Sequence, residues 1–200
     1  MSSRKENIQQ GRALQESDIV QCLKTLSEGG LILYPTDTVW GIGCDATNEE
    51  AVKRVFQLKR RDDSKALIVL IDSAESLDHY VVDVPAIARE LIDVAVKPLT
   101  IIYEGAYNLA RNVLGEGDSV GIRIPNDAFC HQLCERYGAP IVSTSANLSG
   151  LPTARTFADI DAAIVDGVDY AVQCRRDDKT PHTPSNIIML GRDGTFKIIR

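Results

Sequence analysis

What this 200-residue chain lacks narrows the classes of protein to which it can belong. No apolar run approaches the length that a helix needs to cross a bilayer, so we expect no membrane association. The polar segment 1–15 lacks the apolar stretch of a signal peptide, so we expect a flexible arm on a cytoplasmic protein. Residues 16–200 are then expected to form one domain, which is long enough for a sizeable core.

Cysteine is also scarce, with five residues scattered along the chain. An odd number without regular spacing does not predict a disulfide framework. Cys130 and Cys134 lie one helical turn apart beside His131, but no further side chains follow at a spacing that suits zinc. We therefore expect buried thiols and no protein-bound metal.

The chain also lacks an excess of positive charge, since its formal net charge is −6. A protein that binds nucleic acid through its overall charge is therefore excluded. Basic residues are nevertheless concentrated in one short stretch, namely Lys53, Arg54, Lys59, Arg60, Arg61 and Lys65. Such a cluster predicts either a local anionic ligand, since arginine and lysine suit phosphate oxygens, or a solvated helix end with paired charges. The sequence alone favours neither alternative.

Hydrophobic periodicity alternates between the patterns of strands and helices, which predicts an α/β fold with a mixed, twisted sheet and helices packed around it. Strands are expected at 31–34, 66–71, 99–103, 120–124, 141–143, 187–190 and 195–199, and helices at 19–26, from Asn48 onward, 85–95, 126–137 and 157–165. Ser17 or Asp18 would cap the first helix and Gly29-Gly30 would end it. The last two strands would form a hairpin around Asp193-Gly194.

Two segments that follow strands carry polar side chains suited to a site. Segment 34–41 holds two hydroxyls and a carboxylate at the carboxyl end of a strand, where open α/β sheets bind ligands, although its composition also suits a plain turn. Segment 143–150 offers four hydroxyls, an amide and a glycine, which could hold phosphates or form an ordinary turn. It lacks the spacing of a Walker loop, and no Gly-x-Ser-x-Gly elbow of a hydrolase occurs in the chain.

Four motifs together resemble one family. They are Tyr-Pro-Thr-Asp-Thr-Val-Trp-Gly-Ile-Gly-Cys-Asp-Ala at 34–46, Lys59-x-Arg61 with Lys65, Ser-Val-Gly-Ile-Arg-Ile-Pro at 119–125, and Ser-Thr-Ser-Ala-Asn-x-Ser-Gly at 143–150. In order and spacing they are similar to those of the YrdC/TsaC threonylcarbamoyl-AMP synthase family. The resemblance extends from about residue 17 to residue 200 and fits the short, single-domain bacterial form.

The resemblance implies an α/β domain around a large cationic cavity and an enzyme, a nucleotidyltransferase, that works in tRNA processing. Its reaction condenses L-threonine, bicarbonate and ATP, with Mg, into threonylcarbamoyl-AMP and pyrophosphate. Downstream tRNA threonylcarbamoyl-transferase proteins would then modify an adenosine beside the anticodon, and the resemblance also implies a weak contact with tRNA.

The resemblance also implies roles for individual residues. The threonine-binding residues would be Thr38, Arg123, Ser143 and Ser185, and the ATP-binding residues Arg61, Lys65, Ser119, Ser145, Asn147, Thr153 and Arg200. Catalysis would rest on Lys59, Arg61 and Lys65, with Lys59 and Asn147 lining the same cavity. The chemistry agrees, since arginine can hold a carboxylate bidentately and cations can screen a triphosphate, without a covalent nucleophile.

The chain departs from the family pattern at several positions, namely Trp40, Ala66, Leu70, Lys97 and Asn186. Trp40 replaces a usual tyrosine and is expected to serve as an aromatic wall. Two alternative functions stay open: a YciO-type paralogue, and an RNA-binding or ribosome-associated module. Only the synthase would make pyrophosphate in a reaction that depends on both threonine and bicarbonate.

Overall fold

The computed structural model of the chain describes residues 2–61, 66–180 and 183–200, with the side chains described from residue 11 onward. These residues form a nine-stranded sheet in the order β7-β1-β2-β6-β3-β5-β4-β8-β9. The strands are β1 (Ile32–Tyr34), β2 (Gly41–Gly43), β3 (Ile68–Leu70), β4 (Leu99–Tyr103), β5 (Val120–Arg123), β6 (Ile141–Ser145), β7 (Tyr170–Ala171), β8 (Asn186–Leu190) and β9 (Phe196–Ile198). The pairs β1–β7, β3–β5 and β4–β8 are parallel and the other pairs are antiparallel, which confirms the expected mixed sheet.

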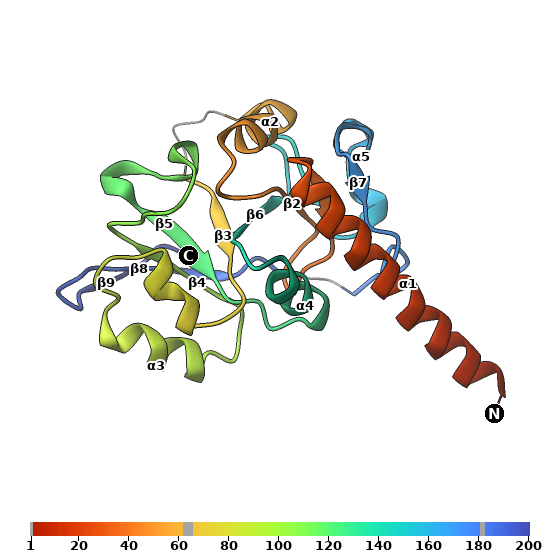
Figure 1. The fold of residues 1–200 in the computed structure, drawn as a ribbon, viewed down its shortest axis with the longest axis horizontal. Helices are drawn as coiled ribbons and strands as arrows, with labels where there is room; N and C mark the ends of the chain where they lie inside the picture. Colours follow the sequence, from red (N-terminus) through yellow and green to blue (C-terminus); the bar gives the residue numbers. More distant parts are fainter. Residues whose placement is uncertain (1, 62–65, 181–182) are drawn as a thin grey trace.

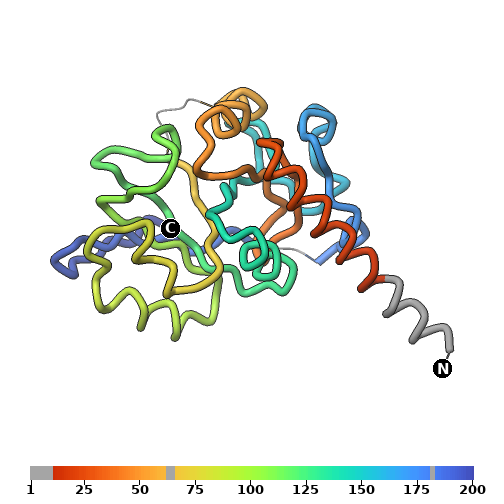
Figure 2. The backbone as a smooth tube through the Cα atoms, viewed as in Figure 1, coloured from red at the N-terminus to blue at the C-terminus, as the bar shows by residue number. Residues whose placement is uncertain are grey.

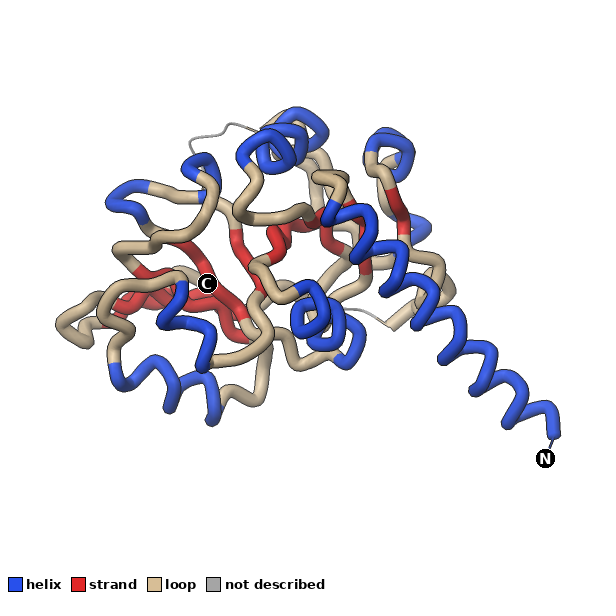
Figure 3. Tube along the Cα trace, viewed as in Figure 1, coloured by secondary structure: helices blue, strands red, loops and turns tan. Residues whose placement is uncertain are grey.

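Helices surround this sheet, as Figures 1 and 3 show. The α-helices are α1 (Ser2–Ser27), α2 (Glu49–Lys59), α3 (Ala86–Val94), α4 (Ala128–Tyr137) and α5 (Ala162–Gly167), and the 3-10 turns are η1 (Glu75–His79), η2 (Arg111–Val113), η3 (Glu116–Asp118) and η4 (Phe157–Asp159). Helix α1 packs on α4, and α2 packs on α5 and η2. No helix among the described residues is both long and apolar enough to cross a membrane.

One core cluster lies between the sheet and its helices, and its largest fully buried side chains include Tyr34, Tyr103 and Phe129. All five cysteines are buried and free, which confirms the prediction of thiols rather than disulfides. Burial raises the pKa of the Cys130 and Cys134 thiols, so both are neutral packing groups at physiological pH.

The first helix begins earlier than the sequence predicts. Helix α1 begins at Ser2, and the part of this helix that Figure 2 draws in colour packs on α4. Asp18 is therefore no helix cap. It is fully buried, and its carboxylate accepts hydrogen bonds from Tyr170 Oη (2.6 Å) and from the backbone N–H of Gln173 (2.9 Å) and Cys174 (2.8 Å). That the segment 1–15 is a flexible arm stays a prediction.

Four other parts of the chain also differ from the expected elements. The expected helix at 157–165 is broken into η4 and α5, because Asp161 accepts from the Ala163 N–H and starts a new helix. Strand β6 continues to Ser145, so three of the hydroxyl residues lie in the sheet rather than in a loop. Strands β2 and β7 have no sequence signal of their own, since Gly-Ile-Gly is a poor strand former that depends on its neighbours.

Strand β2 provides a test of this packing. A Cβ atom added at Gly43 would lie 2.8 Å from Tyr34 Cε1 and 2.9 Å from the Val142 carbonyl oxygen, so only glycine fits between these two strands. We expect Gly43→Ala to lower the free energy of unfolding by about 1–3 kcal/mol, as overpacking does. Urea denaturation monitored by circular dichroism measures this change.

Gly11→Ala is the matched control, because nothing lies within 4 Å of a Cβ at this helical position. It should leave stability unchanged or raise it by about 0.5–1 kcal/mol through helix propensity. Equal destabilisation by both substitutions would contradict the described contact between β1, β2 and β6.

Candidate active site

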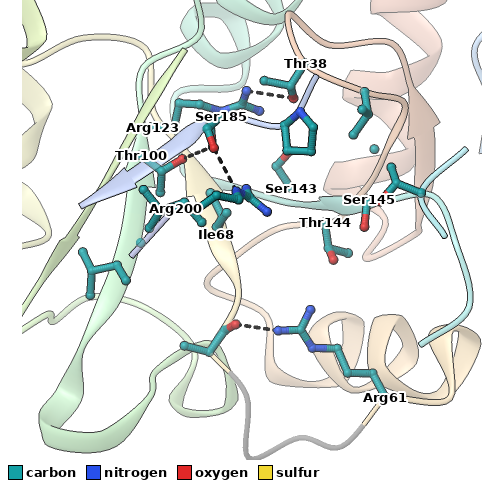
Figure 4. A pocket seen from close by; sticks show the side chains of 18 residues that line it. Thr38, Arg61, Ile68, Thr100, Arg123, Ser143, Thr144, Ser145, Ser185 and Arg200 are labelled. Carbon is teal, nitrogen blue, oxygen red and sulfur yellow. Dashed lines mark hydrogen bonds between the residues drawn. The ribbon is translucent and has the colours of Figure 1, made fainter. Parts of the chain in front are cut away.

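A cavity of about 350 Å³ opens where the central strands meet the C-terminus of the chain. Figure 4 shows its lining at close range. The lining residues are Thr38, Val39, Gly41, Arg61, Ala66, Ile68, Thr100, Ile102, Gly121, Arg123, Ser143, Thr144, Ser145, Thr153, Pro184, Ser185, Ile187 and Arg200. Hydroxyls and arginines dominate its polar part, which suits a ligand that carries several anionic oxygens.

Most residues that the sequence assigns to a site meet in this cavity. Those in its lining are Thr38, Arg61, Arg123, Ser143, Ser145, Thr153, Ser185 and Arg200. Lys59, Ser119 and Asn147 are not among the lining residues, so the expectation that Lys59 and Asn147 line the cavity stays a prediction. Lys65 lies outside the described residues. The roles of all these residues in binding or catalysis stay predictions.

One end of the cavity is built around Arg123, the last residue of β5, whose side chain is 4% exposed. Its Nη1 donates to Asp37 Oδ1 (2.7 Å) and to Thr38 Oγ1 (2.9 Å). Its Nε is buried and has no hydrogen-bond partner among the described residues. A buried donor without a partner costs about 1–3 kcal/mol, so this nitrogen is suited to a ligand that accepts a hydrogen bond.

The C-terminal segment closes the cavity beside Arg123. Ser185 Oγ and Thr100 Oγ1 lie 2.8 Å apart, and both residues are buried. Arg200 Nε donates to the Ser185 carbonyl oxygen (3.1 Å), and backbone hydrogen bonds join Arg200 to Ile187 in both directions. The last residue is therefore held in place rather than frayed. Thr100 is a cavity residue that the sequence does not predict, because its signal is a single hydroxyl within an apolar strand.

The opposite end of the cavity is built around Arg61, as Figure 4 shows. Asn48 caps α2 by accepting from two backbone N–H groups, and Arg60 ends the helix in the left-handed conformation with φ of 49°. This sharp end directs Arg61 to the cavity, where its Nη2 donates to the Ala66 carbonyl oxygen (2.8 Å). Burial lowers the pKa of the Arg61 guanidinium, which nevertheless stays charged.

Lys59 lies behind the cavity wall, and only 2% of its surface is exposed. Its Nζ donates to the carbonyl oxygens of Ser145 and Asn147, the latter at 2.7 Å, and its own carbonyl accepts from the Ser149 N–H at 2.8 Å. Desolvation, and secondarily the charge of Arg61, lower the pKa of the Lys59 ammonium to about 8. Lys59 thus anchors the segment after β6 that carries Ser145 to the cavity.

The other predicted residues also hold backbone near the cavity. Asn147 Nδ2 donates to the carbonyl oxygens of Leu148 (3.0 Å) and Leu151 (2.8 Å) and so stabilises the turn that leads to Thr153. The carbonyl oxygen of Ser119 accepts from the Gly115 N–H at 2.8 Å. These three hydrogen bonds hold the backbone in place. Neither Asn147 nor Ser119 belongs to the cavity lining, so a ligand contact by either side chain stays a prediction.

Two further observations concern Trp40 and the side chains that could bind a metal. Trp40 is 6% exposed and packs edge-on against Phe157, with ring centroids 4.9 Å apart, and it is not in the lining of this cavity. Its expected role as an aromatic wall stays a prediction. Among the described residues, no group of three or more His, Cys, Asp or Glu side chains could hold a metal ion. Arg61, Arg123 and Arg200 are the charged members of the described lining.

Comparison with known proteins gives concordant results. The family model Sua5_yciO_yrdC, described as telomere recombination, matches residues 24–200. The chain is 39% identical over 158 residues to a threonylcarbamoyl-AMP synthase from Xanthomonas euvesicatoria pv. vesicatoria, which covers 78% of this chain and 84% of that protein.

Two solved structures are also similar. Sua5 of P. abyssi, in complex with L-threonine, matches with a TM-score of 0.77 and 29% identity over 86% of this chain and 50% of that chain. The chain therefore spans about half the length of that Sua5. YciO of E. coli matches with a TM-score of 0.75 over 95% of this chain and 89% of that chain, but at 23% identity this likeness concerns the fold alone.

The position of Lys59 generates a prediction with two parts. Lys59→Met should lower the free energy of unfolding by about 1–3 kcal/mol for each buried carbonyl oxygen that loses its donor. It should also raise the KM for ATP, because the segment after β6 would be held less firmly. Lys53→Met is the control, because Lys53 is on the same helix but its side chain is 60% exposed. Equal, small effects of both substitutions would contradict the anchoring role.

The second part concerns pH. The unfolded chain keeps the Lys59 proton up to the ordinary pKa of 10.5, whereas the folded chain releases it near 8. Between these values the unfolded state binds more protons, so the stability of the wild type should rise with pH relative to Lys59→Met. Denaturation curves of both proteins at pH 7, 8.5 and 10 measure this. If the stability of the wild type relative to Lys59→Met fell with rising pH, the burial of the Lys59 ammonium would be contradicted.

Proposed function

The chain belongs to the Sua5/YciO/YrdC family, and we propose that it is a nucleotidyltransferase that makes threonylcarbamoyl-AMP from L-threonine, bicarbonate and ATP. One observation carries this proposal: a single cavity has Arg123 at one end and Arg61 at the other. Such a cavity can hold a carboxylate and a polyphosphate together, which is what the formation of an adenylate requires. Its volume of about 350 Å³ falls within the range of small-molecule sites.

The Arg123 end is proposed to bind L-threonine. The Nε of Arg123 and its second terminal nitrogen can donate two parallel hydrogen bonds to the carboxylate. The hydroxyls of Thr38, Ser143 and Ser185 lie in the same part of the lining and can contact the amino and hydroxyl groups. The complex of P. abyssi Sua5 with L-threonine supports this choice of amino acid.

The Arg61 end is proposed to bind ATP, with the hydroxyls of Ser145 and Thr153 and the guanidinium of Arg200 along the lining between the two ends. Arg61 and Lys65 would stabilise charge on the triphosphate, and Ser119 and Asn147 would contribute at the margin. Mg²⁺ would enter with ATP on the phosphate oxygens, because the described lining contains hydroxyls but no aspartate or glutamate side chain.

The proposed chemistry needs no covalent bond to the protein. The threonine amine and bicarbonate form a carbamate with loss of water, and a carbamate oxygen then attacks the α-phosphorus of ATP. The bond from that phosphorus to the bridging oxygen breaks, and pyrophosphate leaves with the electron pair. The cavity would accelerate this reaction by holding the carbamate in line with the α-phosphorus and by placing cations beside the charge that develops.

The product is a mixed anhydride that hydrolyses in water, so a second enzyme must consume it by carbamoyl transfer. We propose that the tRNA threonylcarbamoyl-transferase proteins expected from the sequence fill this role, and that any direct contact with tRNA is weak. A role in tRNA modification agrees with the expected cytoplasmic location. Identity favours the synthase over the YciO-type alternative, since it is 39% to the Xanthomonas synthase and 23% to YciO.

The activity is tested by a pyrophosphate-release assay in which each substrate is omitted in turn. Purified protein with ATP, Mg²⁺, L-threonine and bicarbonate should release pyrophosphate, and the omission of threonine or bicarbonate should abolish the release. Release that is independent of threonine would indicate another nucleotide reaction. A complete lack of release would favour a binding module.

The two ends of the cavity should respond separately to substitution. Arg123→Lys keeps the charge but loses the planar fork, so it should raise the KM for threonine far more than the KM for ATP. Arg61→Ala should instead weaken the binding of ATP by about tenfold to a hundredfold, which is the effect of losing one charge-assisted hydrogen bond to a phosphate. Steady-state kinetics with each substrate varied measures both effects.

Arg54→Lys is the matched control for Arg123→Lys. Arg54 is also paired with an aspartate, Asp169, at 2.8 Å, but neither residue is in the cavity lining. This substitution should change neither KM. If Arg123→Lys affected both substrates equally, Arg123 would be a structural ion-pair residue and the assignment of the threonine end would be wrong.

A further inference from the structure

Asp37 stands out among the charged residues that the proposed mechanism does not use. Its side chain is 7% exposed, and it does not belong to the cavity lining. Oδ1 accepts from Arg123 Nη1 at 2.7 Å and Oδ2 accepts from the Asn126 N–H at 3.3 Å. The carboxylate is therefore held by backbone on one side and holds the guanidinium on the other.

The hydrogen bonds of Arg123 determine which of its edges is available. Nη1 carries two hydrogens, and both are used, on Asp37 and on Thr38 Oγ1. The remaining N–H groups are on Nε, which is buried without a partner among the described residues, and on Nη2. These two nitrogens form one edge of the guanidinium, which matches the two oxygens of a carboxylate.

The same network determines what Thr38 can offer a ligand. Thr36 Oγ1 donates its one hydrogen to the Val39 carbonyl oxygen (2.7 Å), so in the Thr36–Thr38 hydroxyl pair (2.9 Å) Thr38 must be the donor. Because Thr38 Oγ1 also accepts from Arg123, it has one lone pair left and no hydrogen. Thr38 can therefore only accept a hydrogen bond from a ligand.

We propose that Asp37 is a positioning and specificity-determining residue. It fixes the Arg123 guanidinium with the Nε–Nη2 edge available as a donor, beside the Thr38 hydroxyl that its bond to Thr36 leaves only as an acceptor. Donors for a carboxylate beside an acceptor for an N–H group match an α-amino acid rather than a simple carboxylic acid. The inference rests on the proposed function, since it assumes that Arg123 binds the amino-acid carboxylate.

Two effects of removing Asp37 oppose each other. Loss of its negative charge leaves Arg123 more attractive to any anion, whereas loss of the contact frees a long side chain that must be ordered again on binding. For an amino acid the second effect wins, because the carboxylate can meet the donor edge while the amino group meets Thr38 only if Arg123 is held in this geometry. For a simple anion, the gain in charge offsets part of the loss.

The experiment measures binding of L-threonine, of 3-hydroxybutyrate (threonine without its amino group) and of ATP by calorimetry. We expect Asp37→Ala to raise the Kd for threonine by about tenfold or more, as loss of a charge-assisted hydrogen bond does. Asp37→Asn should have a smaller effect, because its amide oxygen still accepts from Arg123. The preference for threonine over 3-hydroxybutyrate should fall in both variants, while ATP binding stays unchanged.

Asp169→Asn is the matched control, because Asp169 is likewise held by one arginine, Arg54, and by one backbone N–H, that of Leu31. It should alter none of the three affinities. Unchanged or tighter threonine binding in Asp37→Ala would overturn the proposal, and so would an equal loss for threonine, 3-hydroxybutyrate and ATP, which indicates a purely structural role. If Asp37→Ala fails to fold, Asp37→Asn decides by the same criteria.

Failure of this inference is distinguishable from failure of the proposed function. If the wild type binds threonine and the Asp37 variants retain its affinity and selectivity, Asp37 does not position Arg123 and the synthase proposal stands. If the wild type binds neither threonine nor ATP, the proposed function fails first.

Discussion

The buried ion pair between Arg123 and Asp37 is the interaction on which the rest of the cavity depends. A guanidinium that is 4% exposed must be compensated, because an unpaired buried charge costs several kcal/mol. Asp37 supplies the charge and Thr38 a second acceptor, and both belong to the segment that joins β1 to β2. This segment therefore crosses the end of β5, and the cavity forms where the hydroxyls of β6 and the C-terminal segment meet the remaining edge of the arginine.

A second buried cation organises the other side in a different way. Lys59 has no carboxylate partner in the described structure and is held by carbonyl oxygens alone. Burial, and secondarily the charge of Arg61, lower its pKa to about 8. The arrangement gives Lys59 a role that the motif Lys-x-Arg does not reveal. Of the two cations, Arg61 enters the cavity and Lys59 supports the wall behind it. An anion bound at Arg61 would also stabilise the charge on Lys59.

Much of this architecture can be predicted from the sequence, because the strongest signals are local. Apolar runs identify β1, β4 and β5, and Gly138 and Asp193-Gly194 mark where an element ends. The motifs also identify most of the lining. The missed features depend on pairing between distant segments: β2 is a strand only between β1 and β6, and Thr100 belongs to the cavity only because β8 places Ser185 beside it. No sequence pattern near Asp37 predicts its burial against Arg123, and none near Lys59 predicts its burial against the carbonyl oxygens of Ser145 and Asn147.

The central claim is that one cavity joins threonine, a one-carbon unit and the AMP part of ATP. Mass spectrometry of the product formed from ¹³C-bicarbonate, L-threonine and ATP tests it most directly. The account predicts a labile adenylate that contains one threonine, one labelled carbon and one AMP. A product with AMP attached to threonine and no labelled carbon would contradict the account, since the enzyme would then be an aminoacyl-adenylate synthase.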